Sequence, residues 1–430
     1  MKKNDATKGI SRRTFIKTAG IAGAAVGASV SMPGFLRKSW AAKDRILIGH
    51  PSSLTGPLAG LGEPTEWITK RAVEAINKDG GIFLKEAGKK LPVEIKIVDT
   101  QSDPAKSGDV ASKLILKDKI DLMLVMYTPD VVNPVTNMCE RYEMPCISLG
   151  SPAEPWLTGG PYHWSYMAFW SVQSQVQLYV SFWDKIADKT NKVIGAMFPN
   201  DPDGKTMPPV FKEKTEAKGY KWIDPGRFPY FMRDFSAMIN TFRKDKVEIL
   251  TASLISPDFT TAWRQCKQMG FTPKLATIGK ALLFPSALEA LGPDIGHGLT
   301  CEVWWSKHHP YKSSLTGEMP KDICADWEKE TKRQWTPSIG FKHAGYELVA
   351  DTLKRAGTLD KEALRQAIEA TDLDTIIGHI KFDDRHVCET PLVIGQWVKS
   401  DKWPYDLELV YHGQHPEIPT TAELIFPLPA

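Results

Sequence analysis

The sequence predicts an α/β protein made of two doubly wound lobes, each a largely parallel sheet with helices on its faces. From residue 45 onward, short β-rich runs alternate with amphipathic helical stretches, which is the pattern of parallel sheets covered by helices. The part of the 430-residue chain that follows residue 41 exceeds what one hydrophobic core usually supports, so two lobes are expected. Hydrophobic residues make up 42% and charged residues 24% of the chain, as in an ordinary soluble globular protein.

The first set of elements begins directly after residue 45. Strands are expected at 46–49, 93–98, 122–126 and 146–149, and helices are expected to begin near Glu63, Asp103 and Asp130. Asp103-Pro104 places a capping carboxylate before a proline at the first helical position, and Val110, Leu114 and Ile115 then form an apolar helix face. These elements predict one complete α/β lobe.

A second set of the same kind follows Trp164. A helix is expected over 171–188, and strands are expected at 192–198, 221–223, 248–254, 275–278 and 298–303. Ser256-Pro257-Asp258 opens another helix, which should end at Gly270 because glycine is favoured just past a helix terminus. These elements predict the second lobe.

The last third of the sequence returns to helix and then to strand. A long helical region is expected over 321–371, where Ala344, Leu348 and Leu353 recur at helical spacing. Strand-like runs follow at 376–382, 392–398 and 407–411. We therefore expect more than one crossover, with a first lobe of residues 44–165 and 304–385 and a second lobe of residues 166–303 and 386–430.

Ligands of doubly wound sheets bind beyond the carboxyl ends of the strands, where the loops carry variable side chains. In two facing lobes, those ends would line one shared cleft. The loops expected to form it are 49–62, 127–130, 148–156, 199–204, 254–258 and 279–283.

Residues 1–41 have the pattern of an export signal. Ser11 to Lys17 contain the pair Arg12-Arg13, and a soft apolar run from Thr18 to Met32 leads to the small residues of Ser39-Trp40-Ala41. The segment resembles a twin-arginine signal, whose cargo crosses the membrane already folded. The alternative, an ordinary amphipathic helix, is disfavoured by the glycines of the run. We expect a periplasmic protein.

The charge balance changes once this segment is removed. The whole chain has 54 Lys and Arg against 51 Asp and Glu, but residues 1–41 hold eight of the basic and one of the acidic residues. The remainder has 46 basic and 50 acidic residues, a net charge of −4. Without a basic excess, composition does not support binding to nucleic acid or to acidic membrane surfaces.

Six cysteines follow the export signal: Cys139, Cys146, Cys266, Cys301, Cys324 and Cys388. An oxidising compartment permits disulfides, and Cys139 and Cys146 could meet across a helix-to-strand turn. Scattered buried thiols are the alternative, and the spacing does not choose between the two. No CxxC pair and no Cys/His spacing of a zinc site is present, so we predict no metal and no cofactor.

Several motifs together resemble the type I periplasmic solute-binding proteins of ABC importers, in the branch that binds branched-chain amino acids and amides. The matching segments lie in the same order and spacing over almost the whole chain after the export signal: Ile46–Gly49, Leu54–Gly62, Ala72–Ile82, Val98–Pro104, Asp234-Phe235-Ser236 and Gln265–Gly270. The resemblance implies two lobes that are joined by a three-segment hinge and close over a small solute. It also implies delivery to an inner-membrane permease by a monomer.

The resemblance also implies which positions contact the solute. Leu61 stands where relatives often have an aromatic residue, and Tyr127 and Thr128 stand where a serine hydroxyl commonly binds a ligand carboxylate. The segment from Ser148 through Gly150 to Ser151 would complete that clamp. From the second lobe, Asp201 or Asp203 and the pair Ile255-Ser256 lie in the equivalent loops.

Lys280 departs from the family pattern. Amino-acid-binding relatives carry an acidic residue in this loop, which pairs with the α-ammonium group of the ligand, whereas here the loop reads Thr277-Ile278-Gly279-Lys280. A lysine would repel an ammonium group and would form a charge-assisted hydrogen bond with a carboxylate. This favours a carboxylate-bearing solute. The alternative is that Lys280 is a solvated loop lysine.

Aromatic residues are abundant, with 14 tryptophans, and several lie near the expected cleft: Trp67, Trp156, Trp164, Trp170, Trp304 and Trp305. Aromatic walls suit flat solutes, and Trp170 is the expected contact. Phe341, from the long helical region, completes the set. The candidate ligand-binding residues are Leu61, Tyr127, Thr128, Ser148, Gly150, Ser151, Trp170, Asp203, Ile255, Lys280 and Phe341.

An exported enzyme is the competing class of function. The glycine-rich segment Gly56–Gly62 is neither GxGxxG nor a P-loop, and Leu149-Gly150-Ser151-Pro152 lacks the second glycine of a nucleophile elbow. His297, His308 and His309 have no HExxH spacing. A ligand-sensing regulator of the same fold would need no export signal, and a receptor ectodomain would need a following transmembrane helix. We therefore expect a binding protein and no enzyme.

Overall fold

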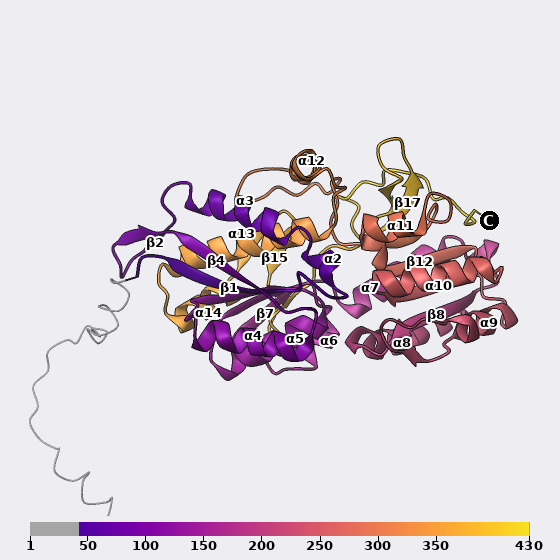
Figure 1. Cartoon of the computed structure of the whole chain (residues 1–430), viewed down its shortest axis with the longest axis horizontal. Helices are drawn as coiled ribbons and strands as arrows, with labels where there is room; N and C mark the ends of the chain where they lie inside the picture. The colour runs from indigo at the N-terminus through magenta and orange to yellow at the C-terminus, as the bar shows by residue number, and fades with distance from the viewer. Residues whose placement is uncertain (1–42, 430) are drawn as a thin grey trace, which may run out of the picture. The chain divides into compact units, whose positions relative to one another are not determined.

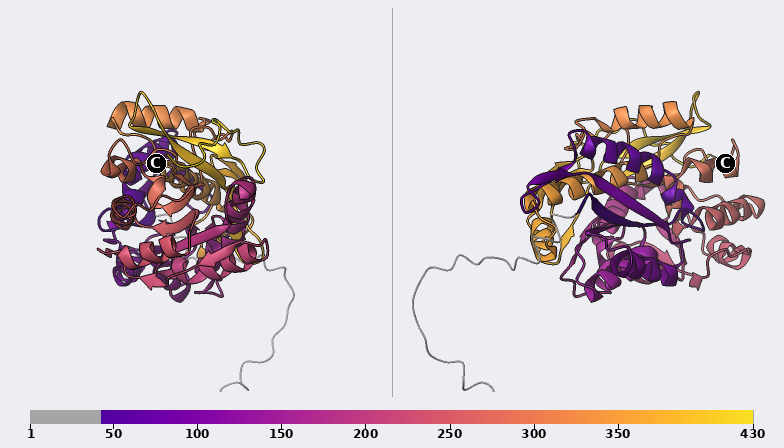
Figure 2. Two further views of the ribbon diagram at one scale, coloured as in Figure 1. Left: turned by 90° about the vertical axis from the view of Figure 1, so that its right-hand side faces the viewer. Right: turned by 60° about the vertical axis from the view of Figure 1, so that its left-hand side comes forward.

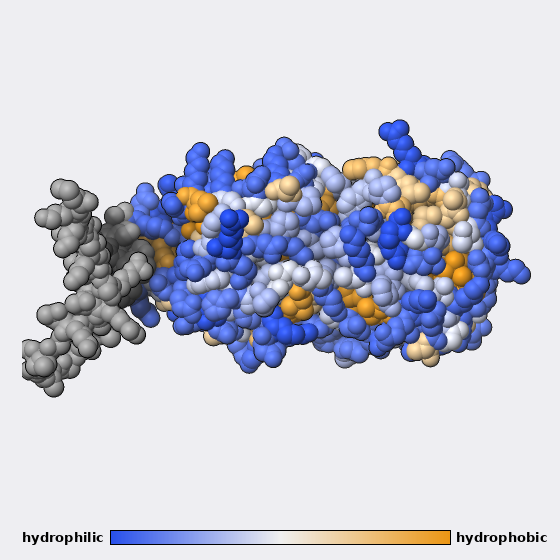
Figure 3. All heavy atoms as spheres, turned by 90° about the horizontal axis from the view of Figure 1, so that it is seen from below, coloured by the Kyte–Doolittle hydropathy of each residue, from blue (hydrophilic) through white to orange (hydrophobic). Residues whose placement is uncertain are grey.

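The computed structural model describes residues 43–429, in which two α/β lobes are visible (Figure 1). The expected export signal lies outside these residues. Within the described part, no helix combines the length and the apolarity that crossing a membrane requires. On the face drawn in Figure 3, apolar residues form small separate patches among hydrophilic ones, with no continuous apolar surface.

The first lobe contains a six-stranded parallel sheet, which matches the expected doubly wound architecture. Its strands, in spatial order, are β16 (Val387–Cys388), β7 (Ser165–Ala168), β6 (Cys146–Leu149), β5 (Leu122–Met126), β1 (Ile46–Ser52) and β4 (Val93–Asp99). Every residue of β5, β6 and β7 is buried, as expected for strands with a helix layer on each face.

Helices cover both faces of this sheet. One layer contains α4 (Pro104–Leu116) and α5 (Pro129–Arg141), and the other contains α3 (Thr65–Asn77) and α13 (Ser338–Ala356), as Figure 1 shows. The smaller elements of this lobe are α2 (Ala59–Gly62), α6 (Ala153–Leu157), α12 (Pro320–Thr331), α14 (Lys361–Glu369) and the hairpins β2 (Ile82–Leu84) with β3 (Lys89–Leu91) and β14 (Asp372–Thr375) with β15 (Gly378–Lys381). The cap predicted for α4 is present, because Asp103 accepts a hydrogen bond from the Lys106 N–H at 2.8 Å.

The second lobe contains an eight-stranded mixed sheet. Its strands, in spatial order, are β10 (Arg227–Phe228), β8 (Val193–Pro199), β11 (Ile249–Leu254), β12 (Leu275–Lys280), β13 (Thr300–Val303), β17 (Val393–Lys399) and β18 (Tyr405–Tyr411), with β9 (Lys221–Ile223) also paired to β8. Strands β17 and β18 are antiparallel and close one edge. The helices are α7 (Val172–Asp184), α8 (Pro202–Glu216), α9 (Ser236–Lys244), α10 (Ser256–Gln268) and α11 (Pro285–Leu291), with short 3₁₀ turns at Ala187–Lys189 and Ala281–Leu283.

The chain passes between the two sheets three times: after β7, after β13 and after β16. Because β7 and β16 pair with the first sheet, that lobe extends a few residues beyond the expected limits at 165 and 385. The turn between β17 and β18 also contacts α12, where Lys402 forms an ion pair with Glu328. Both views of Figure 2 show this yellow C-terminal segment beside the orange helices.

Two segments differ from the sequence-based expectation. The helical region expected over 321–371 is three helices, because Lys332 and Gly357 adopt left-handed conformations (φ +60° and +62°) and Pro337 precedes α13. The strand expected over 376–382 is the shorter β15, which begins at Gly378 with φ +114° and pairs with β14, a strand at 372–375 that was not expected. Further elements were not expected, among them the helices α8, α9 and α11 and the strand β7.

Candidate functional site

A cavity lies between the two lobes, at the carboxyl ends of their strands. The first lobe contributes the segment after β1, including Pro57, Leu58 and Gly60, together with Pro152 and Phe169 after β6 and β7. The second lobe contributes residues at the ends of β11, β12 and β13, with Gln175 and Met207 from α7 and α8. The cavity therefore lies where the sequence placed the cleft.

Seven of the sequence-predicted residues line this cavity: Leu61, Thr128, Gly150, Trp170, Asp203, Ile255 and Lys280. Tyr127 and Phe341 do not; they line a smaller, adjoining cavity. Ser148 and Ser151 line neither cavity. Ser148 is enclosed within β6, with its hydroxyl 3.4 Å from Cys146 Sγ, and the Ser151 hydroxyl donates to the Pro152 carbonyl at 3.3 Å. The expected hydroxyl clamp is therefore not assembled at these two serines.

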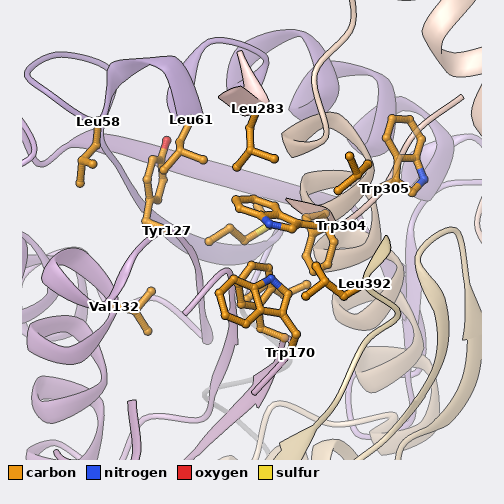
Figure 4. Close-up of a cluster of buried hydrophobic side chains, with 14 of the residues drawn as sticks. Leu58, Leu61, Tyr127, Val132, Trp170, Leu283, Trp304, Trp305 and Leu392 are labelled. Atoms are coloured by element: carbon orange, nitrogen blue, oxygen red, sulfur yellow. The ribbon is translucent and has the colours of Figure 1, made fainter. Parts of the chain in front are cut away.

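Aromatic rings form one wall of the cavity. Phe169 lies 4.7 Å from Trp170 and 4.9 Å from Trp304, measured between ring centroids. Figure 4 shows Trp170 and Trp304 close together, with Leu283 and Leu61 beyond them. The indole Nε1 atoms of both tryptophans are buried and have no hydrogen-bond partner among residues 43–429. This wall offers flat apolar surface and two donors.

The other tryptophans singled out in the sequence pack elsewhere. Trp67 contacts Trp327, Trp156 stacks on Tyr162 and Trp305 contacts Trp335. Trp304, which the sequence placed near the cleft but not among the candidate ligand-binding residues, lines the cavity as Trp170 does. Each of the two follows a strand end that faces the cavity.

Lys280 is paired with two carboxylates. Its Nζ atom lies 2.7 Å from Asp201 Oδ2 and 2.7 Å from Asp203 Oδ2, and only 13% of its side chain is exposed. Asp201 caps α8 by accepting from the Gly204 N–H at 2.6 Å, and Asp203 lies in the first turn of that helix. The backbone of Lys280 is itself unusual, with φ +58° and ψ −71°. The N-terminus of α8 therefore positions both acidic partners of Lys280.

The pKa values in this cluster follow from burial and pairing. Burial raises the pKa of Asp203 to about 6, although Lys280 opposes the change. Burial also acts to raise the pKa of Asp201, but the charge and hydrogen bond of Lys280 outweigh it and hold that pKa below its usual value. Burial alone would lower the pKa of Lys280, and the two carboxylates raise it well above its usual value instead.

This pairing differs from the expectation that Lys280 offers its charge to a ligand carboxylate. A ligand anion at Lys280 would have to compete with two carboxylates that already lie at hydrogen-bond distance. Asp130 is a further acidic group of this cluster. The Tyr230 hydroxyl connects it to Asp201, since it lies 3.1 Å from Asp130 Oδ2 and 2.7 Å from Asp201 Oδ2. This end of the cavity is therefore acidic overall.

Several buried polar atoms of the cavity wall have no hydrogen-bond partner among residues 43–429. They are Asp203 Oδ1, Gln175 Oε1 and Thr128 Oγ1. Such atoms are costly unless a ligand or water satisfies them. Asp203 Oδ1 and Gln175 Oε1 are acceptors, so they suit the hydroxyl or N–H groups of a solute.

Gln175 and Glu302 were not predicted from the sequence. Gln175 lies one turn into α7, after Trp170, and Glu302 lies in β13, where the Tyr179 hydroxyl donates to it. Alternation along β13 could have indicated Glu302, because a carboxylate in a buried strand implies a specific partner. In the described part of the chain, no group of three or more His, Cys, Asp or Glu side chains is placed to hold a metal ion.

Comparison with known proteins gives consistent matches. A family model described as "Periplasmic binding protein" matches residues 45–402. A leucine-, isoleucine-, valine-, threonine- and alanine-binding protein of Pseudomonas aeruginosa is 24% identical over 362 residues, which cover 83% of this chain and 91% of that protein.

Solved structures share the fold. A leucine binding protein, LivK, from Thermotoga maritima has a TM-score of 0.71 at 17% identity, covering 84% of this chain and 97% of its own. A solute binding protein of an ABC transporter from Rhodopseudomonas palustris, in complex with 3,4-dihydroxy benzoic acid, has a TM-score of 0.69 at 18% identity, covering 87% and 99%.

Proposed function

The chain belongs to the periplasmic binding protein family, and from this premise we propose that it is the solute-binding component of an ABC importer. It captures a small organic solute outside the cytoplasm as a monomer and delivers it to a membrane permease. The observation that carries the proposal is the cavity lined by strand ends of both lobes. A solute that contacts both walls favours the arrangement in which the lobes approach each other, because it binds that arrangement better.

The solute we propose has a flat or branched apolar body, a hydrogen-bond donor and a carboxylate. The rings of Phe169, Trp170 and Trp304 support the apolar body, and the unpartnered acceptors of Asp203 and Gln175 support the donor. Among similar proteins, one is named for binding leucine, isoleucine, valine, threonine and alanine, and another was solved with 3,4-dihydroxy benzoic acid. Lys280 does not supply the charge for the carboxylate, since Asp201 and Asp203 neutralise it.

A thermal-shift panel tests this function. We expect at least one of benzoate, 4-hydroxybenzoate, 3,4-dihydroxybenzoate, L-phenylalanine and L-leucine to raise the melting temperature of the protein. A ligand at a hundredfold excess over its Kd stabilises the folded state by about 2.7 kcal/mol. If none of these solutes, nor their amides, raises the melting temperature, the proposed class of solute is wrong.

We also propose export by the twin-arginine route. Arg12 and Arg13 support it, because the pair precedes a weakly apolar segment. The six cysteines of the described part are all buried and free, which is compatible with folding before export. A chain that folds before export buries its thiols in the reducing cytoplasm, whereas a chain that is exported unfolded exposes them to oxidation.

Replacing Arg12 and Arg13 with lysine tests the route. We expect the precursor of this variant to accumulate in the cytoplasm. The control carries the reverse exchange nearby, Lys2→Arg with Lys3→Arg, and should be exported normally. Fractionation followed by immunoblotting measures both variants. Normal export of the Arg12→Lys, Arg13→Lys variant would contradict the proposal.

A further inference from the structure

The smaller cavity is lined by a lysine in unusual surroundings. The cavity is lined by Met126, Tyr127, Leu149, Ser338, Phe341 and Lys342. It also shares Leu61, Gly150 and Trp304 with the main cavity, so the two adjoin. The smaller cavity belongs to the first lobe. A solute could place one group in it while the rest of the solute stays in the main cavity.

Lys342 lies on the buried helix α13 and is 2% exposed. Its Nζ atom is 3.4 Å from the Tyr127 hydroxyl and 4.5 Å from the centroid of the Tyr127 ring. No carboxylate among residues 43–429 forms an ion pair with it. The other deeply buried cations differ in this respect, because Lys280 and Arg365 each contact two carboxylates.

The ionisable groups that face Lys342 carry no negative charge at neutral pH. His50, from β1, is fully buried. Its burial, and to a lesser extent the charge of Lys342, lower the pKa of His50 to about 3. Burial raises the pKa of Tyr127 to about 12, and it raises the pKa of Tyr346, on α13, as well. Burial also lowers the pKa of Lys342 to about 7, and no nearby acid counters that change.

Tyr127 is held in place by contacts of its hydroxyl. Its hydroxyl lies 2.6 Å from the Ser52 hydroxyl and 3.4 Å from the Thr65 hydroxyl. Gly62 permits this arrangement, because a Cβ atom there would lie 3.0 Å from the Tyr127 hydroxyl and 2.2 Å from the Ser53 carbonyl oxygen. The phenol and the ammonium group thus point at the same region from two different elements.

We propose that Lys342 and Tyr127 form a subsite that receives the carboxylate of the solute, while the apolar body of the solute remains against the aromatic wall of the main cavity. This inference rests on the proposed solute-binding function and assigns the anionic group to the first lobe. A buried ammonium group without a counter-ion is unfavourable, and a carboxylate both removes that cost and forms a charge-assisted hydrogen bond. Lys342, and not Lys280, then selects for acids.

Isothermal titration calorimetry of matched acid and amide pairs tests the subsite. The acids are benzoate, 4-hydroxybenzoate, 3,4-dihydroxybenzoate and L-leucine, each compared with its amide, and the proteins are the wild type, Lys342→Met and the control Lys354→Met. Lys354 lies on the same helix but is exposed. We expect Lys342→Met to lower the affinity for the acid that binds by about tenfold to a hundredfold and to leave the affinity for its amide unchanged. The control should match the wild type for both.

Proton uptake gives a readout that needs no variant and that a purely structural lysine would not move. At pH 8 most Lys342 side chains are neutral before binding, so pairing with a carboxylate should take up close to one proton per bound acid. The difference in binding enthalpy between phosphate and Tris buffers measures this number. Lys342→Met should abolish the uptake.

Several outcomes would overturn the inference. One is an acid that binds Lys342→Met as tightly as the wild type, and another is an acid that binds the wild type without taking up a proton. The third is proton uptake with sodium acetate alone and not with any larger acid, which would assign the subsite to free small anions. Binding of an amide but of no acid would reject the subsite and leave the solute-binding function standing. Failure of every solute would reject both.

Discussion

Lys280 and Lys342 are both buried, and their surroundings are opposite. Lys280 lies between Asp201 and Asp203, so its charge is compensated within the protein. Lys342 contacts the phenol of Tyr127 and forms no ion pair with a carboxylate among residues 43–429. Removing one partner of a buried ion pair leaves an uncompensated charge, whereas removing an unpaired buried charge relieves a cost. The same substitution at the two positions should therefore change stability in opposite directions.

Lys280→Met should destabilise the protein by about 3–5 kcal/mol, because two carboxylates lose their counter-ion. Urea denaturation at pH 7 measures the loss. Lys221→Met is the control, since the Lys221 side chain is 60% exposed and its ion pair with Asp245 should contribute less than about 1 kcal/mol. Equal effects of the two substitutions would contradict the assignment of Lys280 to a buried cluster.

Lys342→Met should stabilise the ligand-free protein by about 1–4 kcal/mol at pH 6. The pKa of Lys342 is about 7 in the folded protein, and its ordinary value of 10.5 applies to the unfolded chain. Below pH 7, Lys342 is therefore protonated in both the folded and the unfolded state. Between these two pKa values only the unfolded state holds the proton, and wild-type stability therefore rises with pH. The advantage of the variant should shrink from pH 7 toward pH 10 in denaturation curves. An advantage that grows with pH would have the wrong sign.

At the scale of elements, tertiary packing overrides local preference in several helices. The helix α8 contains Pro208 and Pro209, which remove backbone donors, and the sequence therefore gave no expectation of a helix there. The start of α8 does carry a signal, since Asp201-Pro202 repeats the cap and N1 proline of Asp103-Pro104. In α13, almost every residue from Ser338 onward is buried, so periodicity does not indicate which face packs against the sheet.

Two helical glycines give a matched test of this override. At Gly340 in α13, an added Cβ would lie 2.2 Å from the Trp305 ring, whereas at Gly108 in α4 the nearest atom would be 3.8 Å away. Alanine is favoured over glycine in a helix by about 1 kcal/mol, so Gly108→Ala should stabilise the protein by up to that amount. Gly340→Ala should destabilise it by about 1–3 kcal/mol through overpacking. Thermal denaturation of both variants compares them, and stabilisation by Gly340→Ala would mean that α13 does not pack on Trp305 as described.

At the scale of the whole protein, residues 43–429 form two lobes that touch beside the cavity. Tyr230, in the second lobe, lies within hydrogen-bond distance of Asp130, in the first. Phe284 of the second lobe approaches Gly60 of the first, where an added Cβ would lie 3.4 Å from its ring. These contacts hold the two walls of the cavity together.

Tyr230→Phe should shift the lobes toward a more open arrangement. Loss of a hydrogen bond to a carboxylate costs about 1.5–3 kcal/mol, which corresponds to a roughly tenfold or greater weakening of ligand affinity. We expect a larger radius of gyration for the ligand-free variant in small-angle scattering, and a decrease to the wild-type value with a saturating ligand. Tyr162→Phe removes a bond within the first lobe only, from its hydroxyl to the Trp156 carbonyl, and should leave the radius unchanged. A scattering curve that no ligand alters would contradict closure in either protein.

The sequence by itself determined the two-lobed α/β architecture, because alternating periodicities, caps and breakers act over a few residues and can be read locally. It also indicated the loops that line the cavity, since those follow from the ends of the strands. The charge pattern inside the cavity was decided only by tertiary structure. Lys280 meets Asp201 across 79 residues, and Lys342 meets Tyr127 across 215. Strand order and helix packing bring these groups together, and the net charge that a solute encounters depends on such long-range pairs.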